Sequence, residues 1–238
     1  LDLKSGETSC KKLRSVPTVR RGDLIFTQGN GALPSFAKLR ESPKFRALGI
    51  DPLLIPSDFH LHKTVIYDEK MDAATGAANF EEDAHVAPTH FTTFAHVYDM
   101  STLEVEPYGL ASAAQFVGWQ TRKTPNPSER YKKLRSLILQ RTEEKSPPFG
   151  VIWYRLGPFT TMEQFALGSD ISDRIIVVSS FVPKPDGIGS RNVVEFHVPN
   201  SLAHVHPMLI DAFYDAYDET AEEDRELCLA AEDGYDAR

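Results

Sequence analysis

Residues 174–182, RIIVVSSFV, form a strongly apolar run that is rich in β-branched side chains, and this composition predicts a strand. A turn is expected next, at 183–189, because this segment holds two prolines and two glycines. Residues 192–198, NVVEFHV, then alternate apolar with polar side chains, which is the pattern of a second, half-buried strand. The segments on either side of this pair decide what kind of sheet contains it.

Further strands and helices are predicted outward from this pair. Alternating or β-branched segments predict strands at 24–26, 60–67, 90–98, 103–105 and 150–156. Apolar residues at helical spacing predict helices at 35–48, 110–117, 128–140, 160–165, 207–217 and 221–231. The helix at 160–165 is expected because Thr160 and Glu163 have the spacing of a capping box. Since strands and helices are mixed without regular alternation, the sequence predicts an α+β fold, a mostly antiparallel mixed sheet with flanking helices in a single domain.

The negative charge of the chain is concentrated at one end. The 238 residues carry a formal net charge of −8, and residues 211–238 alone hold 11 acidic residues against Arg225 and Arg238. The sequence therefore divides into a basic N-terminal arm at 1–21, an α+β core domain at 22–210 and an acidic C-terminal helical segment at 211–238. The nearly neutral body lacks the clustered basic face that a nucleic-acid-binding protein needs.

Two cysteines and the absence of a long apolar run bear on the compartment. No run of about 18 apolar residues is present, so no transmembrane segment is expected and a soluble protein is predicted. The chain begins with Leu1, which is compatible with a removed signal peptide. Cys10 and Cys228 could close one long disulfide loop, as in a secreted protein, or could be two reduced thiols in a cytosolic one.

Paired histidines provide one hypothesis for the chemistry. His60 and His62 lie two residues apart on a predicted strand, so both imidazoles share a face. With Glu69 or Glu195 as a third ligand they could hold iron or zinc, in the manner of non-haem metal sites. The alternative is that they are partly exposed histidines bonded to water or to the backbone.

Cys228 provides a second hypothesis, as a nucleophile. A nucleophilic thiol needs a base to remove its proton and a third polar group to orient that base. Cys228 lies in an apolar helical stretch, but four carboxylates lie just before it in the sequence, and negative charge raises the pKa of a thiol. The alternative is an inert, buried cysteine.

The order of several segments resembles the circularly permuted branch of the NlpC-type papain-like cysteine hydrolases. A Gly-Asp turn enters a strand at 22–26, a strand with a histidine follows at 62–67, and a strand ending in an acid follows at 96–99. The segment 151–156 ends near an arginine, as in that family, and 224–228, DRELC, is similar to the segment before its nucleophile. The resemblance implies a hydrolase of amide, peptide or acyl bonds that needs no cofactor.

The same resemblance implies a role for each of three residues. Cys228 attacks the carbonyl carbon, His62 takes the thiol proton, and Asp99 orients the imidazole. The backbone N–H of Cys228 helps to bind the oxyanion. The expected substrate is a small molecule or a peptide.

Three functions therefore stand after the sequence alone. The first is the thiol-type hydrolase, and the second is a metal-dependent enzyme that uses His60 and His62 with iron or zinc. The third is a non-catalytic structural or interaction subunit, in which the basic arm at 1–21 and the acidic segment at 211–238 dock on a protein partner because their charges are opposite to each other.

Overall fold

The architecture is that of a computed structural model, which describes residues 18–21, 24–27, 36–80, 84–109, 112–122, 124–142, 146–185 and 189–236. Its centre is a seven-stranded sheet in which every neighbouring pair is antiparallel, in the order β3-β9-β8-β7-β6-β5-β4. The strands are β3 Phe59–Glu69, β4 Tyr98–Gly109, β5 Ser112–Trp119, β6 Val151–Gly157, β7 Thr160–Ala166, β8 Arg174–Pro183 and β9 Ser190–Pro199. This confirms the predicted α+β class with an antiparallel sheet and flanking helices.

The central strands are buried on both faces of the sheet. On β8, Ile175 and Val177 belong to one apolar cluster, whereas Ile176 and Val178 belong to a second cluster on the opposite face. Successive side chains of a strand point to opposite faces, so a strand covered on both sides is apolar at nearly every position. This is the physical reason for the continuous apolar run at 174–178.

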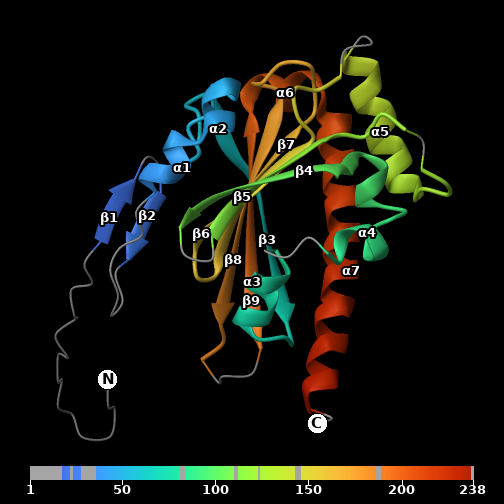
Figure 1. Cartoon of the computed structure of the whole chain (residues 1–238). Helices are drawn as coiled ribbons and strands as arrows, with labels where there is room; N and C mark the ends of the chain where they lie inside the picture. The colour runs from blue at the N-terminus through green and yellow to red at the C-terminus, as the bar shows by residue number, and fades with distance from the viewer. Residues whose placement is uncertain are drawn as a thin grey trace, which may run out of the picture.

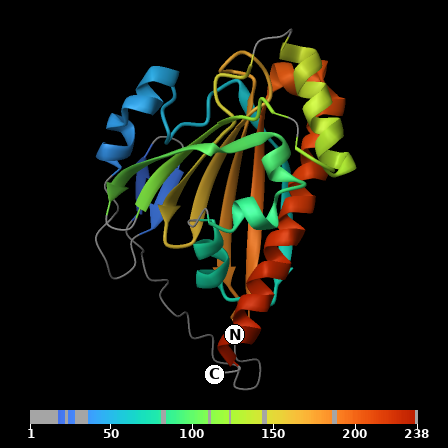
Figure 2. The same cartoon turned by 45° about the vertical axis from the view of Figure 1, so that its right-hand side comes forward.

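Helices cover both faces of the sheet (Figure 1). Helices α1 Ala37–Glu41 and α2 Pro43–Leu48 contribute apolar residues to one cluster, and α5 Glu129–Thr142, α6 Asn200–Val205 and α7 Pro207–Asp236 contribute to the other. The view in Figure 2 shows the sheet between α1 and α2 on one side and α5 and α7 on the other. The remaining elements are the hairpin of β1 Thr18–Arg21 with β2 Leu24–Thr27, the helices α3 Ala73–Asn79 and α4 Val86–Thr89, and the 3₁₀ helix η1 Phe94–His96.

The C-terminal helix α7 is continuous, although two helices are predicted at 207–217 and 221–231. The polar residues between the two predicted helices do not break α7, because its sheet-facing side continues through them. Phe213, Tyr217, Thr220 and Asp224 follow one another at three- or four-residue intervals and all line the same cavity. The acidic character predicted for 211–238 therefore belongs largely to the other sides of this helix.

Three further local predictions are wrong. The predicted strand at 90–98 is instead a turn and the 3₁₀ helix η1, with β4 starting only at Tyr98. In the predicted helix at 110–117, the described residues 112–117 belong to strand β5, whose Phe116 and Val117 pack on opposite faces of the sheet. The predicted helix at 160–165 is strand β7, and Glu163 is not a capping residue there. In each case tertiary packing outweighs the local propensity of the segment.

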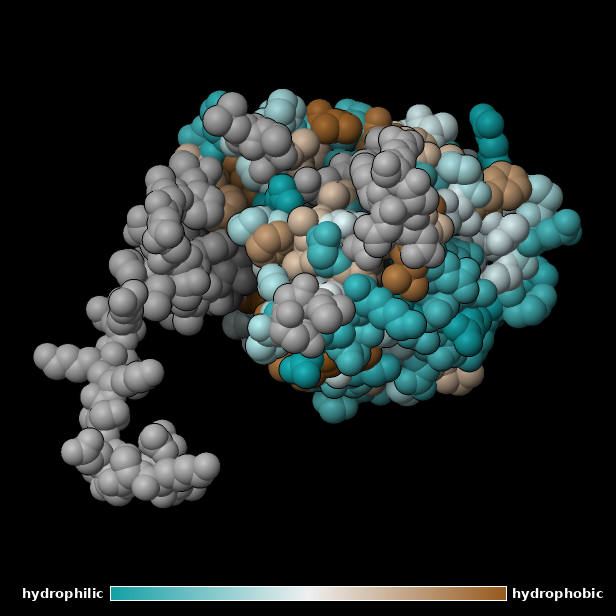
Figure 3. Space-filling model, turned by 90° about the horizontal axis from the view of Figure 1, so that it is seen from below, coloured by the Kyte–Doolittle hydropathy of each residue, from teal (hydrophilic) through white to brown (hydrophobic). Residues whose placement is uncertain are grey.

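The predicted division of the chain is only partly covered by the described residues. Residues 1–17 of the predicted basic arm lie outside them, as does Cys10, so the disulfide between Cys10 and Cys228 stays a prediction. No helix within the described ranges has both the length and the apolar composition needed to cross a membrane. Seen from the side where α7 ends, the coloured surface is mostly hydrophilic, and hydrophobic residues form small separate patches (Figure 3).

Candidate metal centre

Two histidines flank the short helix α4 and lie close together. His85 is the residue before its first turn and His90 is the residue after its last turn, so one helical turn separates them. The backbone N–H of His90 donates to the carbonyl of Val86 at 2.9 Å, which fixes the end of this turn. His90 is buried and His85 is partly buried, and both side chains line a cavity beside α7.

Helix α7 supplies a carboxylate to the same place. Nε2 of His90 lies 2.9 Å from Oδ1 of Asp224, and Nε2 of His85 lies 3.3 Å from the same oxygen. One ligand atom of each of the three residues lies within 4.8 Å of the others. Within the part of the chain that the structure describes, this is the one such group of histidine, cysteine and acidic side chains.

These donor atoms fit a divalent first-row metal ion. Metal–nitrogen and metal–oxygen bonds are about 2.0–2.2 Å long, so two donors at a right angle lie about 3 Å apart. The two distances to Asp224 match that spacing. Two histidines and one carboxylate on one side of a metal, with open positions on the other, form the donor set of non-haem iron oxygenases. His85, His90 and Asp224 would hold such an ion.

The second nitrogen of His90 is held by a neighbouring carboxylate. Nδ1 of His90 lies 2.6 Å from Oε2 of Glu223, and the hydroxyl of Thr93 donates to the same oxygen at 2.7 Å. A metal-binding histidine typically donates its other N–H to a carboxylate, which fixes the orientation of the ring and makes the ligand more basic. Glu223 and Asp224, adjacent on α7, therefore contact the two nitrogens of one imidazole.

The electrostatics of the site couple protons to metal binding. Burial disfavours the charged imidazole of His90, but its hydrogen bonds to Asp224 and Glu223 outweigh burial and raise its pKa to about 9. Burial would raise the pKa of Asp224, but its contacts with His85 and His90 lower that pKa to about 2. A metal ion must therefore displace a proton from His90, because only the neutral imidazole is a ligand.

The site opens into a cavity of about 80 Å³ between α7 and the sheet. Much of its lining is aromatic or aliphatic, and it holds polar groups at few positions. Its lining includes Phe94, Tyr98, Trp153, Glu163, Phe165 and Tyr217. Concave, mostly apolar cavities with a few convergent polar groups are the usual sites for small organic ligands.

Glu163 places an acidic group on the sheet side of this cavity. It is 4% exposed, and burial raises the pKa of its carboxyl group to about 8, with a further rise from the charge of Asp224 and an opposing hydrogen bond from Tyr217. The hydroxyl of Tyr98, also buried and lining the cavity, has no hydrogen-bond partner. The sequence assigned neither residue to a site.

The structure does not bring Cys228, His62 and Asp99 together. His62 is exposed on β3 and Asp99 is on β4, and these are the two opposite edge strands of the sheet. The carboxylate of Asp99 accepts hydrogen bonds from the backbone and hydroxyl of Ser101. Cys228 is 4% exposed and lies in an apolar cluster that includes Phe181.

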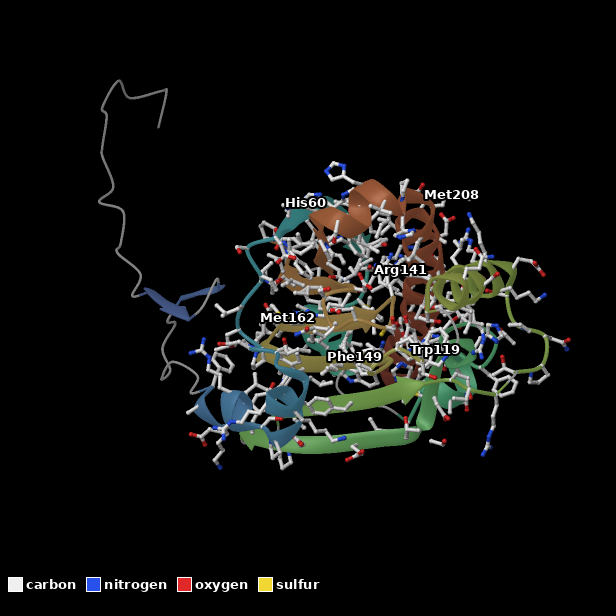
Figure 4. All side chains as sticks on the ribbon, turned by 90° about the horizontal axis from the view of Figure 1, so that it is seen from above. His60, Trp119, Arg141, Phe149, Met162 and Met208 are labelled. Carbon is white, nitrogen blue, oxygen red and sulfur yellow. The ribbon has the colours of Figure 1, made fainter. Side chains whose placement is uncertain are left out.

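His60 and His62 do share a face of β3, as the alternation predicts. Nε2 of His60 lies 3.1 Å from Nδ1 of His62, but neither predicted carboxylate completes a set of three ligands. Glu69, at the far end of β3, forms an ion pair with Arg225, and Glu195 lies on β9. Figure 4 shows His60 beside α6, toward the β3 edge of the sheet, whereas Trp119 on β5 lies toward the β4 edge.

The sequence contained a signal for the site that the prediction missed. His85 and His90 lie close together in the sequence, on either side of α4, and the structure brings their ring centroids to 5.4 Å from each other. In the sequence, Asp224 is one of the carboxylates just before Cys228 and the first residue of the segment 224–228, and nothing there links it to these histidines. It comes from a segment 134 positions after His90, and only the packing of α7 against α4 shows that the two meet.

Comparison with known proteins places these observations in context. No protein-family model matches the chain. The chain is 25% identical over 229 residues to a putrescine 2-hydroxylase of Ralstonia nicotianae, a similarity that covers 95% of this chain and 59% of the relative. A putrescine 2-hydroxylase of Bordetella bronchiseptica is 26% identical over 206 residues, which is 84% of this chain and 45% of the relative. The chain thus spans about half the length of these curated relatives.

A solved structure shares the fold. The quaternary ammonium Rieske monooxygenase CntA, in complex with an inhibitor, superimposes with a TM-score of 0.62 at 12% identity, over 92% of this chain and 51% of that one. A second structure of a quaternary ammonium Rieske monooxygenase has a TM-score of 0.61 at 13% identity, over 92% and 52%. At this identity the similarity shows a common fold and no more.

These findings correct the predicted family and function. The resemblance to NlpC-type cysteine hydrolases is wrong, because the sequence relatives are hydroxylases and the structural neighbours are monooxygenases. The thiol-type hydrolase is therefore also wrong as the main function. The metal-dependent alternative agrees better with the relatives, although the structure gathers a metal-ligand set at His85 and His90 rather than at His60 and His62.

The described residues do not fit the iron–sulfur cluster that the word Rieske implies. Such a cluster is held by two cysteines and two histidines. The described part of the chain has one cysteine, Cys228, and its side chain packs among apolar residues such as Met71 and Phe181. A cluster is therefore not assigned to these residues.

Proposed function

We propose that this chain carries the metal centre of a hydroxylase, in which His85, His90 and Asp224 hold one iron(II) ion and a small organic substrate binds in the adjoining cavity. The observation that carries the proposal is the convergence of these three ligand atoms on one wall of a mostly apolar cavity. The two curated relatives are hydroxylases, which supports the same reaction class.

The overall reaction requires two external electrons. In a hydroxylation, the substrate C–H bond and dioxygen, with two electrons and two protons, give an alcohol and water. When bound, iron(II) supplies the one-electron chemistry by which dioxygen is reduced. The electrons come from a reductant or a partner protein, since the described side chains include no electron donor for this step.

The residues of this chain bind and orient the reactants. His85, His90 and Asp224 would hold the metal ion at the wall of the cavity, and Glu223 fixes the imidazole of His90. Apolar side chains around the cavity exclude bulk water, which protects a reactive site from side reactions. Trp153 and Phe165 form part of this lining from the sheet, and Phe213 from α7.

The test is oxygen incorporation. The chain is loaded with iron(II) and incubated with a chemical reductant, ¹⁸O-labelled dioxygen and a panel of small alkylamines, alcohols and carboxylates. We expect a product that is heavier than one substrate by one ¹⁸O atom, and no such product from Asp224→Ala. Failure of the iron-loaded protein to incorporate label, or equal incorporation by Asp224→Ala, would contradict the proposal. His62→Ala is the matched control and keeps full incorporation.

A further inference from the structure

We propose that Glu163 is the proton donor of this cavity, and that its carboxyl group gives its proton to an oxygen atom of dioxygen as that oxygen is reduced. The inference deepens the proposed function and rests on it, since Glu163 and the three metal ligands line the same cavity. Glu163 lies on the central strand β7, whereas the ligands come from α7 and from the two ends of α4.

The first argument is that the carboxyl group of Glu163 is buried without a cation to pair with it. Glu163 is 4% exposed and lies opposite Trp153 of β6 and Val177 of β8, in the middle of the sheet. No lysine or arginine is among the described residues that line the cavity. A buried carboxylate without a paired cation is costly, so burial favours the neutral acid.

The other titratable groups in the cavity do not reverse this preference. They are His85, His90, Tyr98, Tyr131, Tyr217 and Asp224. The charge of Asp224 raises the pKa of Glu163 further, and the hydrogen bond from Tyr217 lowers it. The three tyrosines are themselves neutral at pH 7, because burial raises the pKa of each hydroxyl. The pKa of Glu163 is about 8 in these surroundings, so its carboxyl group is mostly protonated at pH 7.

The protonated His90 of the metal-free chain is neutralised by carboxylates other than Glu163. Its two ring nitrogens lie 2.6 Å from Oε2 of Glu223 and 2.9 Å from Oδ1 of Asp224. Nε2 of His85 lies 3.3 Å from the same oxygen of Asp224. The two histidines therefore pair with α7, and they leave Glu163 as an acid rather than as a counterion.

The second argument is the orientation of Glu163 by its hydrogen bonds. The hydroxyl of Tyr217 on α7 donates to the carboxyl group, and Oγ of Ser179 on β8 lies 3.3 Å from that hydroxyl. A neutral carboxyl group has one O–H donor besides its acceptor positions, and the bond from Tyr217 uses an acceptor position. The O–H of Glu163 is therefore available to an acceptor inside the cavity.

The third argument is the need for a proton in a cavity with mostly apolar walls. A bound substrate displaces water from such a cavity, so a proton that is needed during the reaction must come from a side chain. A general acid works best when its pKa is near the operating pH, which holds for Glu163.

One proton from Glu163 balances the hydroxylation itself. The substrate C–H bond, dioxygen, two electrons from the external reductant and this proton give the alcohol and hydroxide. The O–H bond of the carboxyl group breaks, and an O–H bond forms on the oxygen atom that leaves as hydroxide. After the product leaves, solvent returns one proton to the carboxylate of Glu163 and gives a second to the hydroxide, which becomes water.

The first measurement concerns the metal-free chain and does not depend on activity. Infrared difference spectra compare the wild type with Glu163→Gln and with Glu195→Gln, a change on β9 outside the cavity lining. At pH 7 we expect the wild type to show the carbonyl band of a protonated carboxyl group, which Glu163→Gln lacks and Glu195→Gln retains. The band should disappear from the wild type in alkaline buffer. A wild type without such a band would overturn the proposal.

The second measurement is the rate of ¹⁸O incorporation by the iron(II)-loaded chain with ascorbate, using the substrate of the panel that the wild type hydroxylates fastest. Glu163→Gln keeps the shape and removes the proton. We expect it to slow incorporation about 100-fold or more, because general acids contribute about 10²- to 10⁴-fold. Glu163→Asp keeps an acid and should recover at least about tenfold of that loss. Glu195→Gln should keep the wild-type rate, and the metal content should be equal in all of these proteins.

The pH profile separates a proton donor from a residue that only supports the fold. The wild-type rate should fall as the pH rises through the pKa of Glu163, since only the protonated form donates. Glu163→Gln should lack this fall. Tyr217→Phe removes a hydrogen bond that lowers the pKa of Glu163, so the fall should move to higher pH in this variant. A fall that stays in place in Glu163→Gln would overturn the proposal.

The outcomes separate this inference from the proposed function. Equal rates of hydroxylation by the wild type and Glu163→Gln would overturn the proton donor and leave the proposed function standing. Dioxygen consumption is recorded on the same samples, and the rate of Asp224→Ala is subtracted. Consumption that depends on Glu163 but gives no hydroxylated product would contradict the proposed function and leave the proton donor standing. Consumption no faster than that of Asp224→Ala would overturn both.

A folding defect in Glu163→Gln, judged by near-ultraviolet circular dichroism, does not prevent the test. In that case the pH profiles of Glu163→Asp and Tyr217→Phe decide. A fall at the wild-type pH in both variants would overturn the proposal, and a shifted fall in Tyr217→Phe supports it.

Discussion

Glu163 and Gln164 are consecutive on β7, and their side chains lie on opposite faces of the sheet. Gln164 is fully buried and satisfied: its amide donates to the hydroxyl of Tyr154 at 2.8 Å and accepts from Nε of Arg174 at 2.8 Å. The hydroxyl of Tyr154 in turn contacts the carbonyl of Pro52 at 2.8 Å. Glu163 faces the cavity beside α7, with one hydrogen bond from Tyr217.

The two faces of the sheet thus differ in how completely their buried polar groups are paired. The face under α1 and α2 contains a polar network whose groups satisfy one another, which is what a stable core requires. The face under α7 keeps a buried carboxyl group, an unpaired hydroxyl at Tyr98 and a set of metal ligands. Departures of this kind from a satisfied core are expected at functional sites.

The largest expected effect concerns the metal ligands on the cavity face. Cobalt(II) at a thousandfold excess over its Kd should stabilise the wild type against urea by about 4 kcal/mol, because it binds the folded chain alone. In Asp224→Ala this gain should vanish, and in His62→Ala it should remain. Equal gains in both variants would show that the metal binds elsewhere.

The next effect concerns Gln164, on the face of the sheet that α1 and α2 cover. Gln164→Leu removes the acceptor of the Arg174 Nε–H and the donor to the Tyr154 hydroxyl, and the loss of these two buried hydrogen bonds should lower the free energy of unfolding by about 2–3 kcal/mol. Metal affinity should stay unchanged. The exposed Gln140→Leu on α5 is the control and should change stability by less than about 0.5 kcal/mol. Loss of metal binding in Gln164→Leu would argue that the two faces are not independent.

A smaller effect is expected for the residue that orients His90. Glu223→Gln should weaken metal binding about 10- to 100-fold, since partners of metal ligands typically contribute that much. The neighbouring Glu222→Gln, an exposed residue paired with Arg225, should stay within about twofold. Isothermal titration with cobalt(II) measures both. If Glu222→Gln and Glu223→Gln have the same affinity, Glu223 does not support the ligand.

The smallest effect is a change in pH dependence. The pKa of Glu163 is about 8 in the folded chain and about 4.5 ordinarily, so the folded state holds a proton that the unfolded chain releases. The wild type therefore loses stability as the pH rises from about 4.5 to about 8. Glu163→Gln lacks this loss, and its stability relative to the metal-free wild type should increase by about 1 kcal/mol between pH 6 and pH 7. Urea unfolding at pH 6 and pH 7 measures the free energies of unfolding of both proteins. An equal change in the variant and the wild type between the two pH values would contradict the raised pKa of Glu163.

The sequence predicted the fold class because the strands with strong patterns were the ones that build the sheet. The apolar run at 174–182 and the alternation at 192–198 are β8 and β9, which pair along most of their length. The same approach fails for 160–165 and 110–117. Residues such as Thr160, Glu163 and Ala114 have local preferences for helix ends or helices, and only pairing with neighbouring strands makes these segments extended.

The site was less predictable than the fold for a physical reason. Two of its ligands, His85 and His90, are close in sequence, and their spacing could have indicated a site. Asp224 and Glu163 come from distant elements, and their meeting depends on the register of α7 against the sheet. By contrast, the spacing of His60 and His62 is easily recognised in the sequence. The structure does bring these two imidazoles together, but among the described residues no third ligand lies beside them.

The most direct test of the account is the metal content of the ligand variants. The wild type, His85→Ala, His90→Ala, Asp224→Ala, His60→Ala and His62→Ala are dialysed against cobalt(II) and then analysed for the metal. The account predicts about one metal ion per chain in the wild type and in the variants of His60 and His62. It predicts none above background in the variants of His85, His90 and Asp224. Stoichiometric metal in those last three variants, or its loss in His60→Ala or His62→Ala alone, would contradict the assignment of the metal centre.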